Sequence, residues 1–481
     1  MAMSPDRRTT AALVLLCAAV FLDSMDLSLM GVALPAIGAD LALPESTLQW
    51  LMSGYAVAYG GFLLLGGRLA DLLGRRRMFL ASLAVFALAS LAGGLLSDGW
   101  ALVATRVVKG VAAALTAPAA LSLITTTFAE GPRRNRALGV YALAGAAGYS
   151  AGLIASGLLT EVSWRLVFFL PVPAALLVLV VAPKVIPAGR VDGPRGGFDA
   201  AGAGAVTGGI LLLVYALTEK SWPAGAGALL LLGAFVAAER RQRDPLVPLG
   251  VFRSGRLASA NLAALAWACA TIGWQFVAVL YLQGVLGYSA LATGLGIVPM
   301  GLAIVVTANL AGRVIERWGL RRTAALGLLV QGAGILLFLR AGASGDYTTV
   351  LLPALVVHGI GNGLSFPSLN IAAVGSLPDD RQGLASGLVT SAVQVGAGIG
   401  VAVLAAVMAV PASLLDGYRA AFLTAGAFSL LGALIAFFGL RTRTTPAAGG
   451  PAAAEPAADE PAASGPTAVR STTTAPSSTR V

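Results

Sequence analysis

Long apolar stretches constrain this chain more than any other feature of its sequence. At about 20 apolar residues per crossing of a bilayer, the sequence predicts fourteen membrane-spanning helices. The expected spans are residues 11–37, 47–67, 78–97, 100–127, 136–160, 164–183, 199–218, 223–239, 257–283, 291–312, 322–340, 348–374, 382–409 and 418–440. We therefore expect an all-α integral membrane protein. Only 11% of the residues are charged, whereas soluble domains have about 25%.

The positive charges between these spans are distributed unevenly. With the N-terminus inside, 26 of the 32 Lys and Arg residues lie on the cytoplasmic side, and Arg165, Lys220, Arg340 and Arg419 lie outside. Such an excess is typical of cytoplasmic loops, so it predicts both termini in the cytoplasm and a multi-pass protein of the plasma membrane. The net charge of +10 lies in these loops and gives no reason to expect a nucleic-acid partner.

One loop sequence occurs twice. GRLADLLGRRR at Gly67–Arg77 is repeated as GRVIERWGLRR at Gly312–Arg322, and each copy follows the second helix of a six-helix block. Secondary transporters are often built from such repeats, with the substrate between the halves. The predicted domains are an N-terminus (1–10), a six-helix bundle (11–183), a linker with two extra helices (184–256), a second six-helix bundle (257–440) and a disordered tail (441–481).

Two carboxylates and two cations fall inside predicted spans. Asp23 and Asp26 are three residues apart and therefore share one helix face, and Arg106 and Lys109 lie in the fourth span. An ionised group at mid-membrane depth costs several kcal/mol unless it is paired, hydrated or protonated. Helix geometry places Asp26, Lys109 and Arg106 roughly 16, 14 and 9 Å below the outer ends of their spans. We expect one cluster that handles protons, and the alternative is a permanently paired structural cluster.

These motifs resemble the major facilitator superfamily and, within it, the fourteen-span drug:proton antiporters. MDLSLMGVALP from Met25 is similar to their first-span signature, with its acid at Asp26, and RVVKG from Arg106 looks like the fourth-span signature with Lys109 in place of Gln. The resemblance implies two six-helix bundles with two extra helices between them. It also implies a conformational-switch loop, formed by Gly67, Arg68, Asp71, Gly74, Arg75 and Arg76.

The fifth span departs from the pattern of this family. Its antiport signature reads Gly-Pro-x-x-Gly-Gly, and this chain has GYSAGL from Gly148. Gly145, Gly148 and Gly152 keep a face of small residues that permits close helix packing, but Tyr149 replaces the Pro. The replacement keeps import or uniport open as alternatives to antiport.

Other polar and aromatic side chains in the spans are candidates for substrate contact. The alternative for the polar ones is a hydrogen bond between helices, and for the tyrosines an anchor at the membrane interface. The candidates are Tyr55, Tyr59, Gln275, Asn309, His358, Asn362, Asn370 and Gln394.

The sequence thus predicts a proton-coupled exporter of hydrophobic or amphipathic, cationic small molecules that acts as a monomer and is not an enzyme. No GxxxxGK[ST] motif, which would bind ATP phosphates, occurs in the chain, and His358 is its single histidine. We therefore expect a proton gradient as the energy source, with no cofactor and no metal. A proton-coupled importer or uniporter is the alternative among transporters, and a polytopic membrane enzyme or sensor is the alternative of another class.

Overall fold

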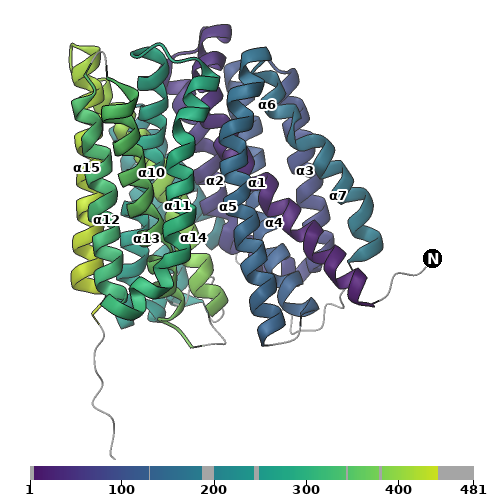
Figure 1. Ribbon diagram of the computed structural model, residues 1–481. Coiled ribbons are helices and arrows are strands. Elements are labelled where there is room, and N and C mark those ends of the chain that lie inside the picture. The colour runs from purple at the N-terminus through teal and green to yellow at the C-terminus, as the bar shows by residue number, and fades with distance from the viewer. Residues whose placement is uncertain are drawn as a thin grey trace, which may run out of the picture. The chain divides into compact units, whose positions relative to one another are not determined.

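The computed structural model describes residues 5–128, 131–186, 200–242, 249–342, 345–378 and 382–441. These residues form helices and short connections, with no strand among them (Figure 1). The predicted tail, apart from Arg441, and most of the predicted linker ahead of the extra helices lie outside the described residues.

The N-terminal half consists of α1 to α7. Its sixth crossing is divided into α6 and α7, because Pro171 has no amide hydrogen with which to continue the helical ladder. The bounds are α1 Pro5–Leu41, α2 Glu45–Leu73, α3 Arg75–Leu95, α4 Gly99–Thr127, α5 Pro132–Val162, α6 Arg165–Phe169 and α7 Pro171–Val185.

An extra helix pair and a C-terminal half follow. The pair is α8 Ala200–Thr218 and α9 Trp222–Arg241. The C-terminal half consists of α10 Arg256–Gly284, α11 Ala290–Trp318, α12 Leu320–Leu337, α13 Leu352–Val374, α14 Gln382–Met408 and α15 Leu414–Gly439, with short turns at Leu249–Ser254, Phe338–Arg340 and Tyr347–Leu351. In the described residues, twelve helices are long and apolar enough to cross a membrane. Helices α2 and α8 occupy the other two predicted spans, and a total of fourteen crossings is compatible with the structure.

The two halves repeat one packing scheme. In the N-terminal half α1 packs against α5 and α7, α2 against α4, and α3 against α4 and α7. In the C-terminal half α10 packs against α14 and α15, α11 against α13, and α12 against α13 and α15. Each pair in one half has its counterpart in the other, so the repeat found in one loop extends over the whole of both bundles.

Close contacts between helices show which residues of the two halves are equivalent. A Cβ atom at Gly110 of α4 would overlap the carbonyl oxygen of Tyr55 on α2, and one at Gly359 of α13 would overlap that of Met300 on α11. Glycine permits such an approach of two helix backbones. Gly110 and Gly359 are therefore equivalent positions, as are Tyr55 and Met300.

The repeated loop has the same backbone conformation in both halves. Gly74 joins α2 to α3 with φ 93°, and Gly319 joins α11 to α12 with φ 82°. A positive φ is readily adopted only by glycine. The matching glycines of the two loop sequences thus make the same sharp turn between consecutive helices.

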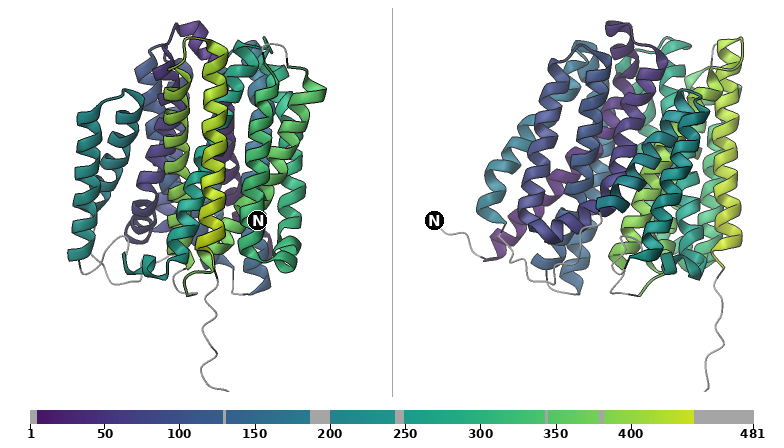
Figure 2. Two further views of the ribbon diagram at one scale, coloured as in Figure 1. Left: turned by 90° about the vertical axis from the view of Figure 1, so that its left-hand side faces the viewer. Right: turned by 180° about the vertical axis from the view of Figure 1, so that it is seen from behind.

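The extra pair lies on one side of the two halves. Helices α8 and α9 pack against each other, and α8 contacts α2 of one half and α14 of the other. The Thr207 hydroxyl donates to the Gly61 carbonyl across 2.9 Å. Seen from behind in the right-hand view of Figure 2, these teal helices lie in front of the place where the halves meet.

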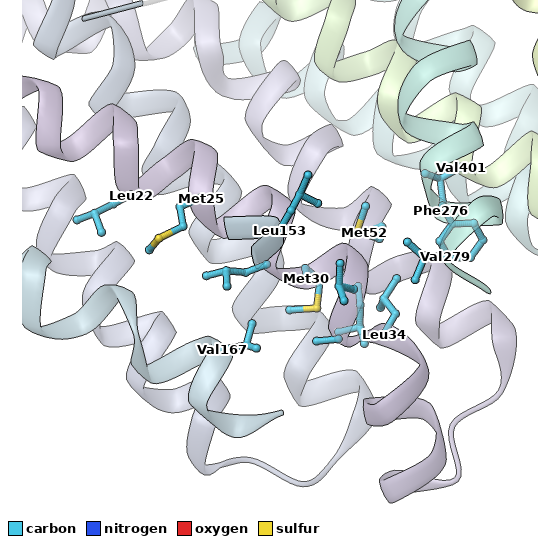
Figure 3. Close-up of a cluster of buried hydrophobic side chains, with 14 of the residues drawn as sticks. Leu22, Met25, Met30, Leu34, Met52, Leu153, Val167, Phe276, Val279 and Val401 are labelled. Carbon is cyan, nitrogen blue, oxygen red and sulfur yellow. The ribbon is translucent and has the colours of Figure 1, made fainter. Parts of the chain in front are cut away.

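We call the face where α1 begins the proximal face and the opposite one the distal face. Two hydrogen bonds join the halves near the distal face: Gln283 Nε2 donates to the Val32 carbonyl, and the Leu291 amide donates to the Glu161 carboxylate, each over 3.1 Å. Buried apolar side chains of both halves also meet in the distal half of α1, where those of α10 and α14 approach it (Figure 3). These contacts hold the halves together on the distal side.

The backbone contact at Gly359 gives a stability prediction. We expect Gly359→Ala to lower the thermal unfolding midpoint of the detergent-purified protein, because added volume in a tight contact costs about 1–3 kcal/mol. Gly139→Ala is the matched control, since nothing lies within 4 Å of a Cβ atom there. Equal midpoints for the two variants would contradict the close approach of α13 to α11.

Candidate functional site

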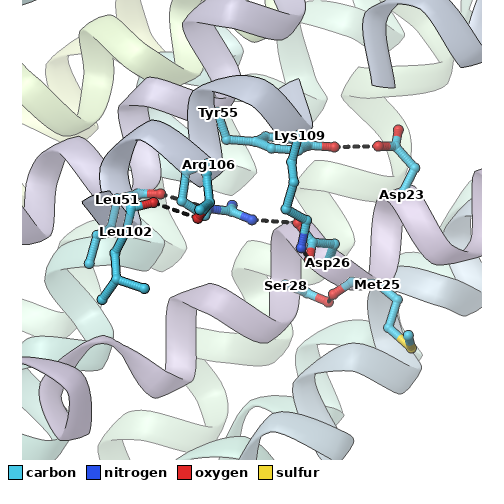
Figure 4. Close-up of polar contacts among 10 residues, drawn as sticks. Asp23, Met25, Asp26, Ser28, Leu51, Tyr55, Leu102, Arg106 and Lys109 are labelled. Atoms are coloured by element: carbon cyan, nitrogen blue, oxygen red, sulfur yellow. Dashed lines mark hydrogen bonds and ion pairs between the residues drawn. The ribbon is translucent and has the colours of Figure 1, made fainter. Parts of the chain in front are cut away.

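A buried ion cluster joins α1 to α4. Both carboxylate oxygens of Asp26 are bound: Oδ2 accepts from Arg106 Nη1, and Oδ1 accepts from Lys109 Nζ (Figure 4). Asp26 is 2% exposed, and Arg106 and Lys109 are fully buried. The three side chains form two salt bridges in the interior of the N-terminal half.

Further contacts fix the two cations. Arg106 Nε donates to the Leu51 carbonyl of α2 across 3.0 Å, and its guanidinium carbon lies 4.6 Å from the centre of the Tyr55 ring. Lys109 Nζ lies 4.7 Å from the Phe86 ring centre and 5.5 Å from that of Phe168. Aromatic faces attract cations, most strongly where water is excluded. The cluster is therefore anchored by α2, α3 and α6 as well as by α1 and α4.

Asp23 has different surroundings from Asp26, although the two share a helix. It is only partly buried, and its Oδ1 accepts a hydrogen bond from the Tyr55 hydroxyl (Figure 4). Tyr59 and Tyr141 lie near enough to interact with the same carboxylate. In the part of the chain that the structure describes, Asp23 forms no ion pair. One face of α1 thus carries two carboxylates: Asp26 is held in ion pairs, and Asp23 forms none among the described residues.

The fifth span packs closely on the first. A Cβ atom at Gly148 would overlap the Phe21 carbonyl oxygen, one at Gly152 would lie 2.6 Å from the Met25 oxygen, and one at Gly145 would lie 3.4 Å from the Ser24 hydroxyl. These glycines let α5 lie directly against the segment of α1 that carries both acids.

Tyr149 connects the two halves. Its hydroxyl donates to Gln275 Oε1 on α10. Gln275 is 3% exposed and also approaches α1, because its Nε2 lies 3.8 Å from the Cβ position of Gly31. The residue that replaces the family's Pro therefore makes a polar contact between the halves, beside Gly31 of α1.

The remaining candidates for substrate contact do not gather in one place. The side-chain amides of Asn309 and Asn370 donate to carbonyls of their own helices, those of Val305 and Phe366. His358 is fully buried within the C-terminal half, where its ring stacks on Trp274 at 4.3 Å, and neither ring nitrogen has a hydrogen-bond partner among the described residues.

Two other candidates are buried at helix contacts. Asn362 is 6% exposed in the interior of the C-terminal half. Gln394 is 6% exposed and packs beside Gly60, where α14 meets α2. Of the eight candidates, Tyr55 contacts Arg106 and Asp23, and Tyr59 interacts with Asp23.

The predicted switch loop lies at the proximal face. Gly67 is in α2, Gly74 makes the turn, and Arg75 and Arg76 begin α3. Arg76 Nη2 donates to the Pro183 carbonyl of α7 across 2.9 Å. The side chains of Arg68 and Asp71, which belong to the same prediction, lie outside the described residues.

Sequence reasoning missed Phe86 and Phe168, which face Lys109, and Tyr141, which interacts with Asp23. All three lie in apolar spans, where an aromatic residue is an ordinary core residue, so no local pattern distinguishes them. Only their positions relative to these charged groups do. Among the described residues, no group of three or more His, Cys, Asp or Glu side chains is placed to hold a metal ion.

The fold and this cluster define the class of protein: a polytopic membrane protein of two similar helical halves with ionised groups buried in one of them. Solved structures share the fold. A bacterial homologue of the lysosomal transporter Spinster matches with a TM-score of 0.66 at 15% identity, covering 90% of this chain and 97% of that one. A peptide transporter of the POT family matches with a TM-score of 0.67 at 17% identity, covering 91% and 98%.

The family model of the Major Facilitator Superfamily matches residues 16–310 and 300–476. The chain belongs to this superfamily of membrane transporters. It is 36% identical to a puromycin resistance protein of Streptomyces alboniger, over 92% of this chain and 93% of that protein. It is 38% identical to a cephamycin export protein of Amycolatopsis lactamdurans, over 88% and 90%. The predicted family, the all-helical membrane fold and the assignment as a transporter rather than an enzyme are therefore confirmed.

The ion cluster gives a second stability prediction. Asp26→Asn leaves two buried cations without the carboxylate that pairs with both, and breaking a buried pair in this way costs about 3–5 kcal/mol. We expect a low yield of folded protein and a lowered unfolding midpoint in detergent. Asp26→Asn combined with Lys109→Gln should recover part of the loss.

The matched control for this prediction is Asp40→Asn in the same helix. Asp40 pairs with Arg165 across 3.2 Å, but both side chains are substantially exposed, and exposed pairs contribute little. An Asp26→Asn protein as stable as Asp40→Asn would contradict a buried, fully paired cluster.

The contact between Tyr149 and Gln275 predicts a conformational effect. Tyr149→Phe keeps the ring but removes the hydroxyl, so we expect a larger population with the halves separated on the distal side. Spin labels at the exposed positions Val162 and Val410 would report it as a longer distance in pulsed electron resonance. Tyr347→Phe is the control, because that hydroxyl donates to Gly296 within one half. Identical distance distributions would show that the hydroxyl does not hold the halves together.

Proposed function

We propose that this protein is a proton-driven exporter of hydrophobic or amphipathic, cationic small molecules, such as antibiotics, which works by alternating access. The observation that carries the proposal is a charged cluster buried in a transporter fold whose relatives are named for antibiotic resistance and export. They include the puromycin and cephamycin proteins and a tetracenomycin C resistance and export protein that is 32% identical over 84% of this chain.

The physical basis of coupling is a carboxylate that can exchange a proton within the membrane. An ionisable group at this depth is by default functional, because an ionised side chain inside the membrane costs several kcal/mol. Asp23 and Asp26 are the candidate acids, and Arg106 and Lys109 compete with protons for them. Protonation changes the charge of the cluster and can therefore favour one arrangement of the two halves over the other.

The distal contacts support a state of the cycle that is closed on one side. With the distal face outside, as the positive-inside rule predicts, these contacts favour a state closed to the exterior. Both termini then lie in the cytoplasm and the protein in the plasma membrane, where a potential of 100 mV supplies about 2.3 kcal/mol per proton. We propose that it acts as a monomer, since each chain contains both halves.

A proton-coupled importer or a uniporter is the second candidate. The specific observation in its favour is Tyr149, which stands where antiporters of this family have Pro. The direction of proton movement separates the candidates, because only an antiporter moves protons against the flow of substrate.

The coupling prediction is tested in everted vesicles acidified inside by respiration. Adding an exported antibiotic should release protons from wild-type vesicles, seen as recovery of a quenched pH-sensitive dye. The Asp23→Asn/Asp26→Asn double variant should lose this recovery about tenfold or more, as expected for a group whose proton transfer is essential. Asp40→Asn should behave like wild type. Uptake of the antibiotic without proton release would contradict antiport and favour a uniporter.

A further inference from the structure

We propose that Asp23 is the single exchange site of this transporter, which binds either one proton or the cationic nitrogen of the substrate, while Asp26 is held permanently by Arg106 and Lys109. This inference rests on the proposed export function, and it names Asp23 as the residue that binds the cationic group of the substrate. It departs from the sequence pattern, in which Asp26 occupies the family's acidic position.

The first argument is the difference in pairing. Both oxygens of Asp26 are occupied by cations and the residue is 2% exposed, so neither a proton nor a ligand can reach it without breaking two salt bridges. Asp23 is only partly buried, and the groups bonded to it are neutral phenols, those of Tyr55 and Tyr59. A neutral donor is far easier to displace than two buried cations. Of the two acids, Asp23 is the accessible one.

The second argument is the charge of the cluster. Asp26, Arg106 and Lys109 together have a net charge of +1, and the ionised Asp23 brings the four groups to zero. A proton on Asp23 and a monovalent cation bound to it give the same net charge. The two can therefore replace each other without a change in the net charge of the site, and net charge matters most where the dielectric is low.

The third argument is the chemistry around Asp23. The titratable and charged groups that face it are Tyr55 and Tyr59 from α2, Lys109 from α4, Tyr141 from α5 and Asp26 on its own helix. The Tyr55 and Tyr59 rings stand nearly perpendicular, with centres 6.0 Å apart. A carboxylate with phenol oxygens provides hydrogen-bond acceptors, and the rings add favourable contact for a cation. This combination suits a lipophilic organic cation with N–H groups.

The exchange fixes the stoichiometry. The proton that arrives from outside binds a carboxylate oxygen of Asp23 as the substrate cation leaves that oxygen, and the same proton later departs to the cytoplasm as the next cation binds. One proton enters for each cation exported. Since one positive charge moves in each direction, export of a monovalent cation is electroneutral, whereas export of a neutral substrate by the same cycle carries one net charge inward.

The binding experiment uses the full-length protein in detergent and rhodamine 6G, a fluorescent cation whose charge is constant between pH 5.5 and 8.5. The apparent Kd of the wild type should rise as the pH falls, towards a limit of about tenfold per pH unit, which is the dependence for competition by one proton. Asp23→Asn should bind weakly at every pH, with no pH dependence. Asp40→Asn should reproduce the wild-type profile.

Two further variants keep the assignment open to refutation. Tyr55→Phe should keep the pH dependence, because the carboxylate remains. Asp26→Asn combined with Lys109→Gln, which avoids an excess of buried positive charge, should also keep it. If this double variant lost the pH dependence while Asp23→Asn retained it, Asp26 would be the exchange site and the proposal would be wrong. Absence of rhodamine 6G binding to the wild type would also overturn it.

The transport experiment tests the stoichiometry in proteoliposomes. After subtraction of the passive movement in protein-free liposomes, a pH gradient should drive rhodamine 6G movement, nigericin should abolish it, and a potassium potential set with valinomycin should leave it unchanged. A remaining response to the potential alone would overturn the exchange of one proton for one cation. Absence of any gradient-driven transport would refute the proposed export function, while the binding profile of Asp23→Asn would still decide the role of Asp23.

Discussion

The structure of the N-terminal half depends on one interaction: the carboxylate of Asp26 held between Arg106 and Lys109, away from water. Charges in an apolar bundle are tolerable only when they are paired and hydrogen-bonded. The Leu51 carbonyl accepts from Arg106 Nε, and the rings of Tyr55 and Phe86 face the two cations, whereas Arg106 Nη2 has no hydrogen-bond partner among the described residues. The aromatic surroundings of the cluster are therefore part of the same electrostatic requirement.

The two halves share their packing scheme but not their polar chemistry. Gly110 and Gly359 occupy equivalent positions, so the preceding residues, Lys109 and His358, are equivalent as well. Lys109 pairs with Asp26, whereas His358 is buried against Trp274 without an ion pair among the described residues. The ionised groups that we connect with coupling lie in one half, and the other half supplies Gln275, the partner of Tyr149. When the halves separate or come into contact, the hydrogen bond between Tyr149 of one half and Gln275 of the other would break or form.

Much of this could be predicted from residue patterns. The apolar runs, the repeated loop and the positions of Asp26, Arg106 and Lys109 predicted the helices, the two halves and the meeting of α1 with α4. The partners of the cations could not be predicted, since Phe86 and Phe168 resemble any other aromatic residue of a membrane span. Nor could the different surroundings of Asp23 and Asp26, because a three-residue spacing specifies a shared helix face but not which neighbouring helix each side chain meets.

The sequence by itself determined that the chain is a membrane-spanning helical protein with a duplicated architecture, because apolar length and repeated loop residues are local properties that need no knowledge of neighbours. The tertiary structure alone decided which charges are paired, which acid stays accessible and that Tyr149 bridges the halves. Those outcomes depend on distances between residues that are far apart in the chain, such as Tyr149 and Gln275, and only the packing of helices sets such distances.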